Sequence, residues 1–112
     1  MDAVIREPWA AKDVNKIRNR ETAMTIVASF TTDLNLQQYD EIWRQLREAK
    51  ADHPAGRLSH VGFEKDGVMR VIDVWESPES FEAFGATLMP IIVSVGGSVT
   101  PDITEAHHFQ TG

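Results

Sequence analysis

The stretch GRLSHVGFEKDGVMRVIDVWE, residues Gly56 to Glu76, decides the fold that the sequence predicts. It contains two runs rich in β-branched and aromatic residues, and the dipeptide Asp66-Gly67 joins them. Asp-Gly between strand-like runs is the strongest short-range signal for a β-hairpin, because a two-residue type I′ turn requires positive φ at both central positions. The stretch therefore predicts two antiparallel strands joined by a two-residue turn.

A two-residue turn also fixes the register of the hairpin, with Lys65 opposite Val68 and each later pair further from the turn. In this register His60 lies opposite Asp73. The other pairs on the same face are Leu58 with Trp75, Gly62 with Val71, and Glu64 with Met69. All eight side chains are expected on one face, because side chains alternate along a strand. An imidazole would lie there beside a carboxylate, near an indole and a glycine that leaves room, which predicts a small-ligand pocket.

The chain before the hairpin predicts one strand and one helix. Residues 23–32, AMTIVASFTT, alternate between apolar side chains and the others in the manner of a strand. Asn35 and Gln38 form the capping-box pattern that is typical of a helix start. Apolar residues then recur at helical spacing, and the segment His-Pro-Ala-Gly at 53–56 is expected to end the helix.

The chain after the hairpin predicts a second helix and a last strand. Ser77 followed by Pro78 places a good N-cap before a proline at the first helical position. The helix should end at Gly96-Gly97, and Pro90 is expected to kink it or make it restart near Met89. Residues 101–109 then alternate as a final strand.

The predicted order is β-α-β-β-α-β, the ferredoxin-like pattern of an α+β protein. Its four strands would form one antiparallel sheet with both helices on one face, in a single domain over residues 23–110. Residues 1–22 would be an N-terminal extension. The other face is too apolar to stay exposed comfortably, so we expect two copies to bury it in a homodimer. The hairpin residues predicted on that face are Ser59, Val61, Phe63, Arg70, Ile72 and Val74.

Composition indicates a small globular protein, and we expect it in the cytoplasm. The 112 residues suffice for one domain, and a hydrophobic content of 42% suffices for one core. A net charge of −6 argues against nucleic acid or an anionic membrane as partner, because either requires a basic face. The chain has no cysteine, which excludes disulfides and thiolate chemistry. No apolar run reaches the roughly 18 residues of a membrane span.

Two motifs carry a resemblance to a known family. D-V-W-E-S at Asp73 to Ser77 is followed by S-F-E-A-F at Ser80 to Phe84. With the predicted βαββαβ order, they resemble the antibiotic biosynthesis monooxygenase-like family of the dimeric α+β barrel superfamily, over residues 23–110. The resemblance implies a pocket between sheet and helices and a partner subunit that closes the barrel. That superfamily includes cofactor-free oxygenases, polyketide cyclases, lactone isomerases and haem-degrading oxygenases.

The haem-degrading members of that superfamily place a histidine ligand on the second helix, and a tryptophan of the W-E-S motif lines their cavity. Trp75 corresponds to that tryptophan. This chain has no histidine anywhere in residues 77–106. The resemblance therefore favours the members that work without haem, and we expect no cofactor.

His60 and Asp73 are the candidate catalytic residues. A carboxylate beside an imidazole fixes its tautomer and suits it to acid–base catalysis near neutral pH, whereas the alternative is a purely structural cross-strand pair. Trp43 is expected to belong to the core. His107 and His108 should point to opposite faces of a strand, so we expect no metal site. The candidate substrate-binding residues are Trp75, Leu58, Gly62, Val71 and Tyr39.

Together these features predict an enzyme for a flat, apolar or aromatic small molecule, similar to cofactor-independent monooxygenases or cyclases of aromatic polyketide-like metabolites. His60 would remove a proton, Asp73 would orient His60, and Trp75 would stack on the substrate. In an oxygenation the resulting carbanion would itself reduce oxygen, whereas in an isomerisation or ring closure the pair would shuttle one proton. The alternative is a non-catalytic ligand-binding or dimerisation module.

Overall fold

The computed structural model describes residues 24–112, so the N-terminal extension expected over residues 1–22 lies outside the described residues. The elements are β1 Ile26–Thr32, α2 Leu36–Glu48, β2 Arg57–Lys65, β3 Val68–Trp75, α3 Pro78–Ser94 and β4 Val99–Glu105. Their order confirms the predicted β-α-β-β-α-β pattern.

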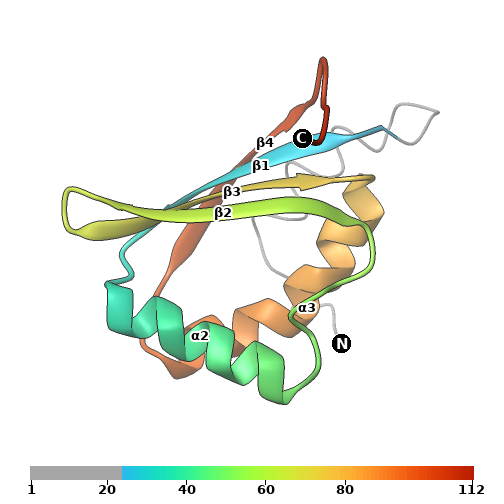
Figure 1. Cartoon of the computed structure of the whole chain (residues 1–112). Helices are drawn as coiled ribbons and strands as arrows, with labels where there is room; N and C mark the ends of the chain where they lie inside the picture. Colours follow the sequence, from blue (N-terminus) through green and yellow to red (C-terminus); the bar gives the residue numbers. More distant parts are fainter. Residues whose placement is uncertain (1–23) are drawn as a thin grey trace.

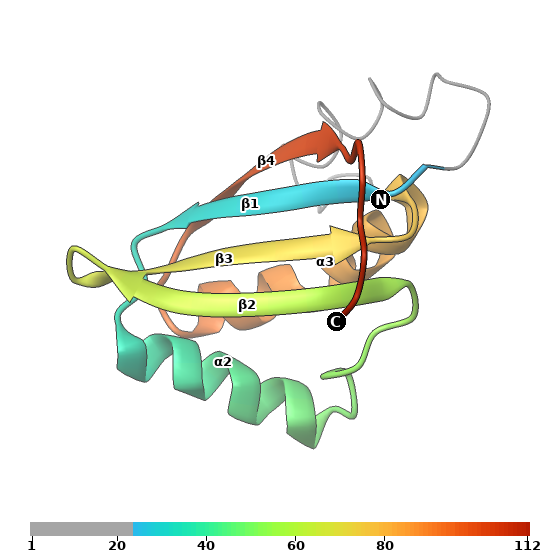
Figure 2. The ribbon, with the colours of Figure 1, turned by 45° about the horizontal axis from the view of Figure 1, so that its top comes forward.

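The strands form one antiparallel four-stranded sheet in the order β2-β3-β1-β4. Figure 1 shows α2 and α3 together on one face of this sheet, and Figure 2 shows the four strands side by side with the β2–β3 turn at one end. This is the expected ferredoxin-like α+β fold. Within residues 24–112 no helix is both long enough and apolar enough to cross a membrane.

The turn of the β2–β3 hairpin is built as the sequence predicts. Asp66 and Gly67 have φ values of 56° and 86°, so both central positions are left-handed as a type I′ turn requires. Lys65 pairs with Val68 beside the turn. Further along, His60 pairs with Asp73, Gly62 with Val71, and Glu64 with Met69. The predicted register is therefore confirmed over most of the hairpin.

The register shifts at the open end of the hairpin, and there the prediction for Leu58 is wrong. Arg57, not Leu58, pairs with Trp75, while Ser59 pairs with Val74. The strand β2 carries one extra residue at this point, which is a β-bulge, and a bulge changes the face to which nearby side chains point. Leu58 is 41% exposed as a result.

The helix α2 begins as predicted and ends earlier. Asn35 Oδ1 accepts a hydrogen bond of 2.8 Å from the Gln38 backbone N–H, which completes the capping box. The helix ends at Glu48 because Lys50 adopts a left-handed φ of 58°. The Lys50 N–H donates to the Arg47 carbonyl at 3.0 Å, and the Ala51 N–H donates to the Leu46 carbonyl at 2.8 Å. These two bonds form a Schellman motif, here with lysine in the place that glycine usually takes.

The helix α3 begins at Pro78 with Ser77 as its N-cap, as predicted. It continues through Pro90 to Ser94 as a single helix, so the helix does not restart near Met89. The last strand is shorter than the expected 101–109 and starts earlier, because it pairs with β1 only as far as Glu105.

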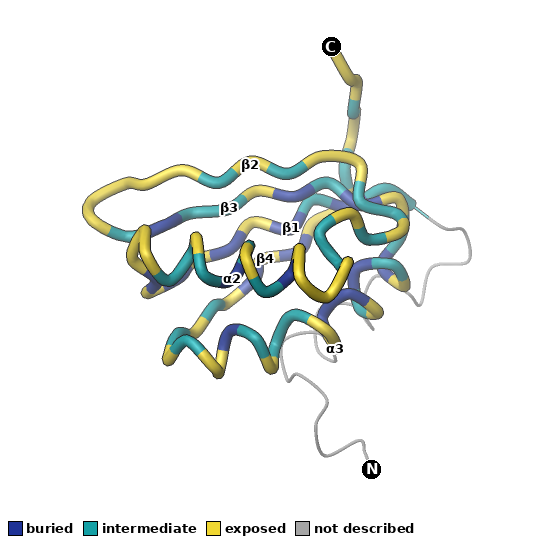
Figure 3. The backbone as a smooth tube through the Cα atoms, turned by 60° about the horizontal axis from the view of Figure 1, so that its bottom comes forward, coloured by how far each residue is buried: buried dark blue, intermediate teal, exposed yellow. Residues whose placement is uncertain are grey.

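The hydrophobic core lies between the sheet and the two helices. Figure 3 shows buried positions recurring along β1, β3 and α3 where the two layers meet. The largest fully buried side chains are Trp75, Phe81, Ile26 and Ile92. On the opposite face of the sheet Val61, Phe63 and Ile72 are 50%, 39% and 38% exposed. The alternation predicted for the hairpin thus separates a covered face from an open one.

Candidate functional site

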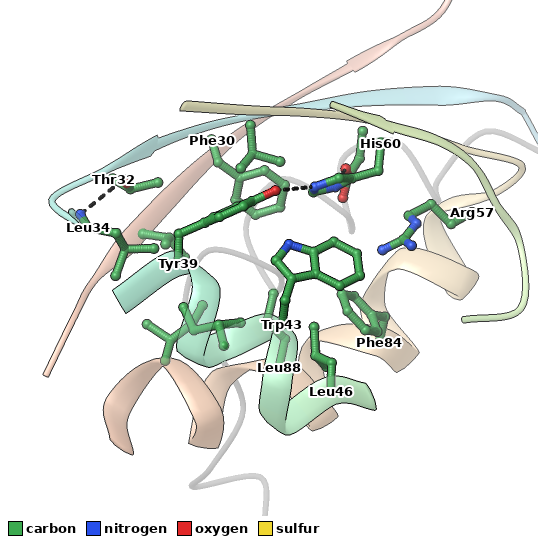
Figure 4. A pocket seen from close by; sticks show the side chains of 15 residues that line it. Phe30, Thr32, Leu34, Tyr39, Trp43, Leu46, Arg57, His60, Phe84 and Leu88 are labelled. Carbon is green, nitrogen blue, oxygen red and sulfur yellow. Dashed lines mark hydrogen bonds and ion pairs between the residues drawn. The ribbon is translucent and has the colours of Figure 1, made fainter. Parts of the chain in front are cut away.

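A cavity lies between the inner face of the sheet and the two helices (Figure 4). The space at this site amounts to about 480 Å³, and this figure includes open solvent at the mouth of the cavity. Most of its lining is apolar and comes from several elements, with Phe30, Ile42, Trp43, Val71, Phe84 and Leu88 among these residues. The few polar side chains are therefore the groups that can orient a ligand or carry out chemistry.

Three of these polar side chains form one hydrogen-bonded chain, the Tyr39–His60–Asp73 relay. His60 Nδ1 lies 2.6 Å from Asp73 Oδ1, and His60 Nε2 lies 2.8 Å from the Tyr39 hydroxyl oxygen. Figure 4 shows the Tyr39 hydroxyl pointing directly at the His60 ring. The exposed fractions of the His60 and Asp73 side chains are 18% and 3%. The pairing predicted for His60 and Asp73 is thus present, and it is largely shielded from water.

The distances determine how protons can be arranged along the relay. An ionised Asp73 only accepts hydrogen bonds, so His60 Nδ1–H donates to it. In the neutral imidazole, Nε2 then holds a lone pair and accepts the Tyr39 O–H. A proton that reaches Nε2 creates an imidazolium beside the buried carboxylate. Tyr39 is therefore the end of the relay through which a proton would enter or leave.

Two aromatic rings hold the imidazole of His60 in place. The Tyr39 ring is nearly parallel to it, at 14°, and meets it end to end through the hydroxyl, with ring centroids 6.4 Å apart. The Trp43 indole meets it edge-on, with ring centroids 5.0 Å apart. The hydrogen bonds at both ring nitrogens and the contact with Trp43 restrict rotation of the imidazole, so its two nitrogens stay aimed at their partners.

Gly62 makes space for the relay. A Cβ atom placed at Gly62 would overlap the Tyr39 hydroxyl and would lie 2.6 Å from Tyr39 Cζ. The sequence indicated that this glycine leaves room on the inner face, and the room is occupied by Tyr39. The absence of a side chain at Gly62 therefore allows the Tyr39 hydroxyl to take its position beside His60.

Burial raises the pKa of the Tyr39 hydroxyl above its ordinary value of 10.0, and the nearby charge of Asp73 acts in the same direction. A hydrogen bond with Trp43 and the positive charge of Arg57 lower this pKa, but they do not reverse the shift. The hydroxyl therefore stays protonated near neutral pH. It can pass a proton along the relay, but it does not act as a free tyrosinate.

The structure exchanges the roles that the sequence indicated for two tryptophans. Trp75, a candidate substrate-binding residue, is 0% exposed and packs against Phe81 and Phe84, at centroid distances of 5.8 Å and 5.4 Å. It belongs to the core and does not line the cavity. Trp43, expected in the core, lines the cavity and contacts His60. Spacing along a helix indicates a buried stripe but does not reveal which of its members faces a hollow.

Of the remaining candidate residues, some line the cavity and others do not. Val71 and Tyr39 line the cavity, whereas Leu58 does not, because the bulge turns it outward. His107 and His108 are exposed beyond the end of β4, away from the cavity lining. Within the part of the chain that the structure describes, no cluster of three His, Asp or Glu residues could hold a metal ion.

Arg57 is a charged cavity residue that the sequence analysis did not predict. The bulge brings it to the inner-face position opposite Trp75, where the regular register would place Leu58. Its guanidinium carbon lies 5.4 Å from the centroid of the Trp43 ring, a cation–π distance. No residue type in the stretch marks this bulge, so it could not be predicted from the sequence.

The fold and the cavity together define a ferredoxin-like α+β protein with a largely apolar pocket between its sheet and helices. No family model matches the chain, and no curated protein matches it. Among solved structures the chain is similar to SnoaB, described as a cofactor-independent oxygenase from Streptomyces nogalater. The TM-score is 0.53 at 16% sequence identity, and the match covers 77% of this chain and 94% of that one. A match at this identity establishes a shared fold, and at that level it agrees with the family resemblance in the sequence.

Proposed function

We propose that this cavity is the active site of an enzyme that acts on a flat, largely apolar small molecule without a bound cofactor. The observation that carries the proposal is the Tyr39–His60–Asp73 relay, which ends in an otherwise apolar cavity. Polar chains of this kind are costly to enclose, and at the edge of a cavity they are typical of acid–base sites. The similarity in fold to an oxygenase described as cofactor-independent supports the same class of reaction.

In the proposed mechanism the three side chains move one proton together. Tyr39 accepts a proton from an acidic C–H or O–H of the substrate while its own proton passes to His60 Nε2. The imidazolium that forms is stabilised by Asp73, which stays ionised throughout. The raised pKa of Tyr39 fits this role, because the hydroxyl transfers protons without existing as a free anion.

The substrate anion then has two fates. In an oxygenation the anion supplies electrons to O₂, so that a CH₂ group becomes a carbonyl, one oxygen atom enters the product and the other leaves as water. In an isomerisation or ring closure the relay returns the proton to a different atom of the substrate. We favour oxygenation, because the similar solved structure is an oxygenase.

A second hypothesis is that the protein is a non-catalytic ligand-binding module. It is favoured by the fact that both ring nitrogens of His60 already have hydrogen-bond partners within the protein. A relay of purely structural value would satisfy these buried groups and would do no chemistry.

The test is turnover by Tyr39→Phe and His60→Gln variants, with His53→Gln as the matched control. His53 is an exposed histidine outside the cavity lining. Oxygen consumption and product absorbance are followed with a panel of anthrones and hydroxynaphthalenes, flat compounds with acidic protons. We expect Tyr39→Phe and His60→Gln to lower kcat by about 10²- to 10⁴-fold, the usual contribution of acid–base catalysis. The His53→Gln variant should keep the full rate.

The same variants distinguish catalysis from binding. If compounds of the panel bind and none is turned over, the binding module is correct. If turnover occurs and both relay variants retain the wild-type rate, the relay has no catalytic role.

A further inference from the structure

The most informative feature that the relay leaves unexplained is the guanidinium of Arg57 at the cavity. It is a cation on a lining that is otherwise nearly all apolar, and an irregularity in the strand places it there. Bulges are over-represented beside functional sites because they redirect a side chain. The question is which group this charge faces.

Within residues 24–112, Arg57 has no carboxylate partner. Its Nη2 donates a hydrogen bond of 2.8 Å to the backbone carbonyl of Asp52, and no other hydrogen bond or ion pair of its side chain is present in that range. A guanidinium has five N–H donors, so this single bond leaves four of them without a partner among the residues that the structure describes. Removing a cation from water beside an apolar cavity costs free energy, and an anion bound next to it offsets part of this cost.

The surroundings of Arg57 fix its position. The Cζ atom lies 5.4 Å from the centroid of the Trp43 ring and 5.9 Å from that of Phe84. Figure 4 shows the guanidinium directed toward these two rings. The bond to the Asp52 carbonyl holds the same group from the loop before β2. A guanidinium held in this way is prepared to bind a planar anion without much loss of rotational freedom.

The Trp43 indole connects Arg57 to the relay. Its ring is 5.0 Å from the His60 ring and 5.4 Å from Arg57 Cζ. The positive charge of Arg57 also acts on the Tyr39 hydroxyl and lowers its pKa, which places the two groups within electrostatic reach of each other. A single flat ring system lying along Trp43 would therefore present one end to Arg57 and another to Tyr39.

We propose that the substrate is an aromatic acid, whose carboxylate binds Arg57 while its ring lies along Trp43 within reach of the Tyr39 hydroxyl. The inference rests on the proposed function, because it identifies the substrate class of the same site. A guanidinium fork matches a carboxylate in shape and charge, and such a pair is stronger than a neutral hydrogen bond. A net charge of −6 repels anions in general, so an acidic ligand needs a local cation of this kind.

The experiment compares the binding of 2-naphthoate and 2-naphthamide, which have the same ring and differ in charge. Isothermal titration calorimetry is carried out on the full chain and on the variants Arg57→Gln and Arg57→Lys. The control is Arg47→Gln, which removes an exposed arginine of α2 outside the cavity lining. Circular dichroism and thermal melting confirm that each variant is folded.

We expect the wild-type chain to bind the naphthoate more tightly than the naphthamide. Arg57→Gln should weaken naphthoate binding by about tenfold to hundredfold, the range of a hydrogen bond between charged groups. It should leave naphthamide binding nearly unchanged. Arg57→Lys should lie between these limits, because a lysine keeps the charge and loses the fork. Arg47→Gln should bind both compounds as the wild type does.

Four results would overturn the inference, and the first three compare compounds or variants. The naphthamide could bind as tightly as the naphthoate, or Arg57→Gln could leave naphthoate binding intact, or it could weaken both compounds equally. The third result would assign Arg57 a structural role in holding Trp43 and the loop. Failure of both compounds to bind the wild type would contradict the aromatic-acid site itself.

These results are separable from the proposed function. The naphthoate could bind in an Arg57-dependent manner while no compound is turned over. This result would support the aromatic-acid site and contradict the proposed enzymatic function. A neutral aromatic compound could be turned over in a Tyr39-dependent manner while the chain shows no preference for the naphthoate. This result would support the proposed enzymatic function and contradict the aromatic-acid site.

Discussion

The two faces of the β2–β3 hairpin consist of alternate residues of the same two strands, and they differ in almost every physical respect. On the inner face the helices cover His60 and Asp73, whose side chains are 18% and 3% exposed. On the outer face Val61 and Phe63 stay 50% and 39% exposed, although they are apolar. Polar groups are thus enclosed on the face that lines the cavity. Apolar groups are exposed to solvent on the face that no helix of residues 24–112 covers. This difference is the basis on which we propose a site on one face and a subunit interface on the other.

The largest effect is expected in the core beside the site. Trp75→Ala should lower the free energy of unfolding by about 3–5 kcal/mol, because it empties the space between Phe81 and Phe84. Urea unfolding followed by circular dichroism measures this loss. Trp43→Ala should cost less stability, because Trp43 is only partly buried and lines a cavity. A larger loss at Trp43 than at Trp75 would contradict the division of this layer into core and pocket.

A second comparison, between two glycines of the hairpin, separates the site from the turn. Gly62→Ala should cost about 1–3 kcal/mol of stability, because the new methyl group overlaps the Tyr39 hydroxyl. It should also abolish most turnover, because Tyr39 must move away from His60. Unfolding in urea and the kcat of the folded variant give the two quantities.

Gly67→Ala is the matched control. A Cβ at Gly67 meets nothing within 4 Å, but its φ of 86° disfavours any other residue, so about 1 kcal/mol of stability should be lost. Turnover should remain, because the turn does not line the cavity. If Gly62→Ala kept full turnover, Tyr39 would not need its present position.

The sequence predicted the covered face of the hairpin well where local chemistry decides the structure. Asp66 and Gly67 carry their own turn preference, and the pairing of His60 with Asp73 follows from that turn by counting. The capping residues of both helices likewise act on their immediate neighbours. These features depend on only a few adjacent residues.

The sequence was less informative where packing between distant elements decides. The bulge at the open end of β2 has no residue signature, so a regular register predicts Leu58 on the inner face, where the structure has Arg57. The end of α2 at Glu48 depends on the left-handed conformation of Lys50, which helix propensity does not indicate. Whether Trp43 or Trp75 faces the hollow depends on how α2 and α3 lie on the sheet. Alternation assigns a face, but it does not locate the cavity within that face.

The outer face gives a smaller effect on stability and a qualitative one on assembly. We propose that a second copy of the chain covers Val61, Phe63 and Ile72, because an exposed apolar face of this kind is costly in a monomer. Val61→Lys should leave the stability of each protomer nearly unchanged and convert a dimer to a monomer. Size-exclusion chromatography with light scattering measures the mass. Gln37→Lys, on the exposed side of α2, should remain dimeric, and a wild-type monomer would contradict the proposal.

The smallest effect is a titration that reports on the inner face directly. Tyr39 is the single tyrosine of the chain, so tyrosinate absorbance reports on it alone. Burial raises its pKa above 10.0, and therefore the folded chain should release this proton at a higher pH than the chain unfolded in urea. Between the two pKa values the unfolded state binds fewer protons than the folded state. The stabilising effect of the neutral phenol is thus complete below pH 10.0 and is lost as the pH rises through the folded pKa.

The Asp73→Asn variant sharpens this measurement. Removing the carboxylate charge should bring the Tyr39 titration closer to its ordinary position without restoring it fully, because burial is the larger cause of the shift. If Tyr39 titrates identically in the folded and the unfolded chain, its hydroxyl is open to water. The enclosed relay that distinguishes the inner face from the outer one would then be absent. If Asp73→Asn leaves a raised pKa unmoved, the hydroxyl is enclosed but is not coupled to the carboxylate, and the relay would have to end at His60.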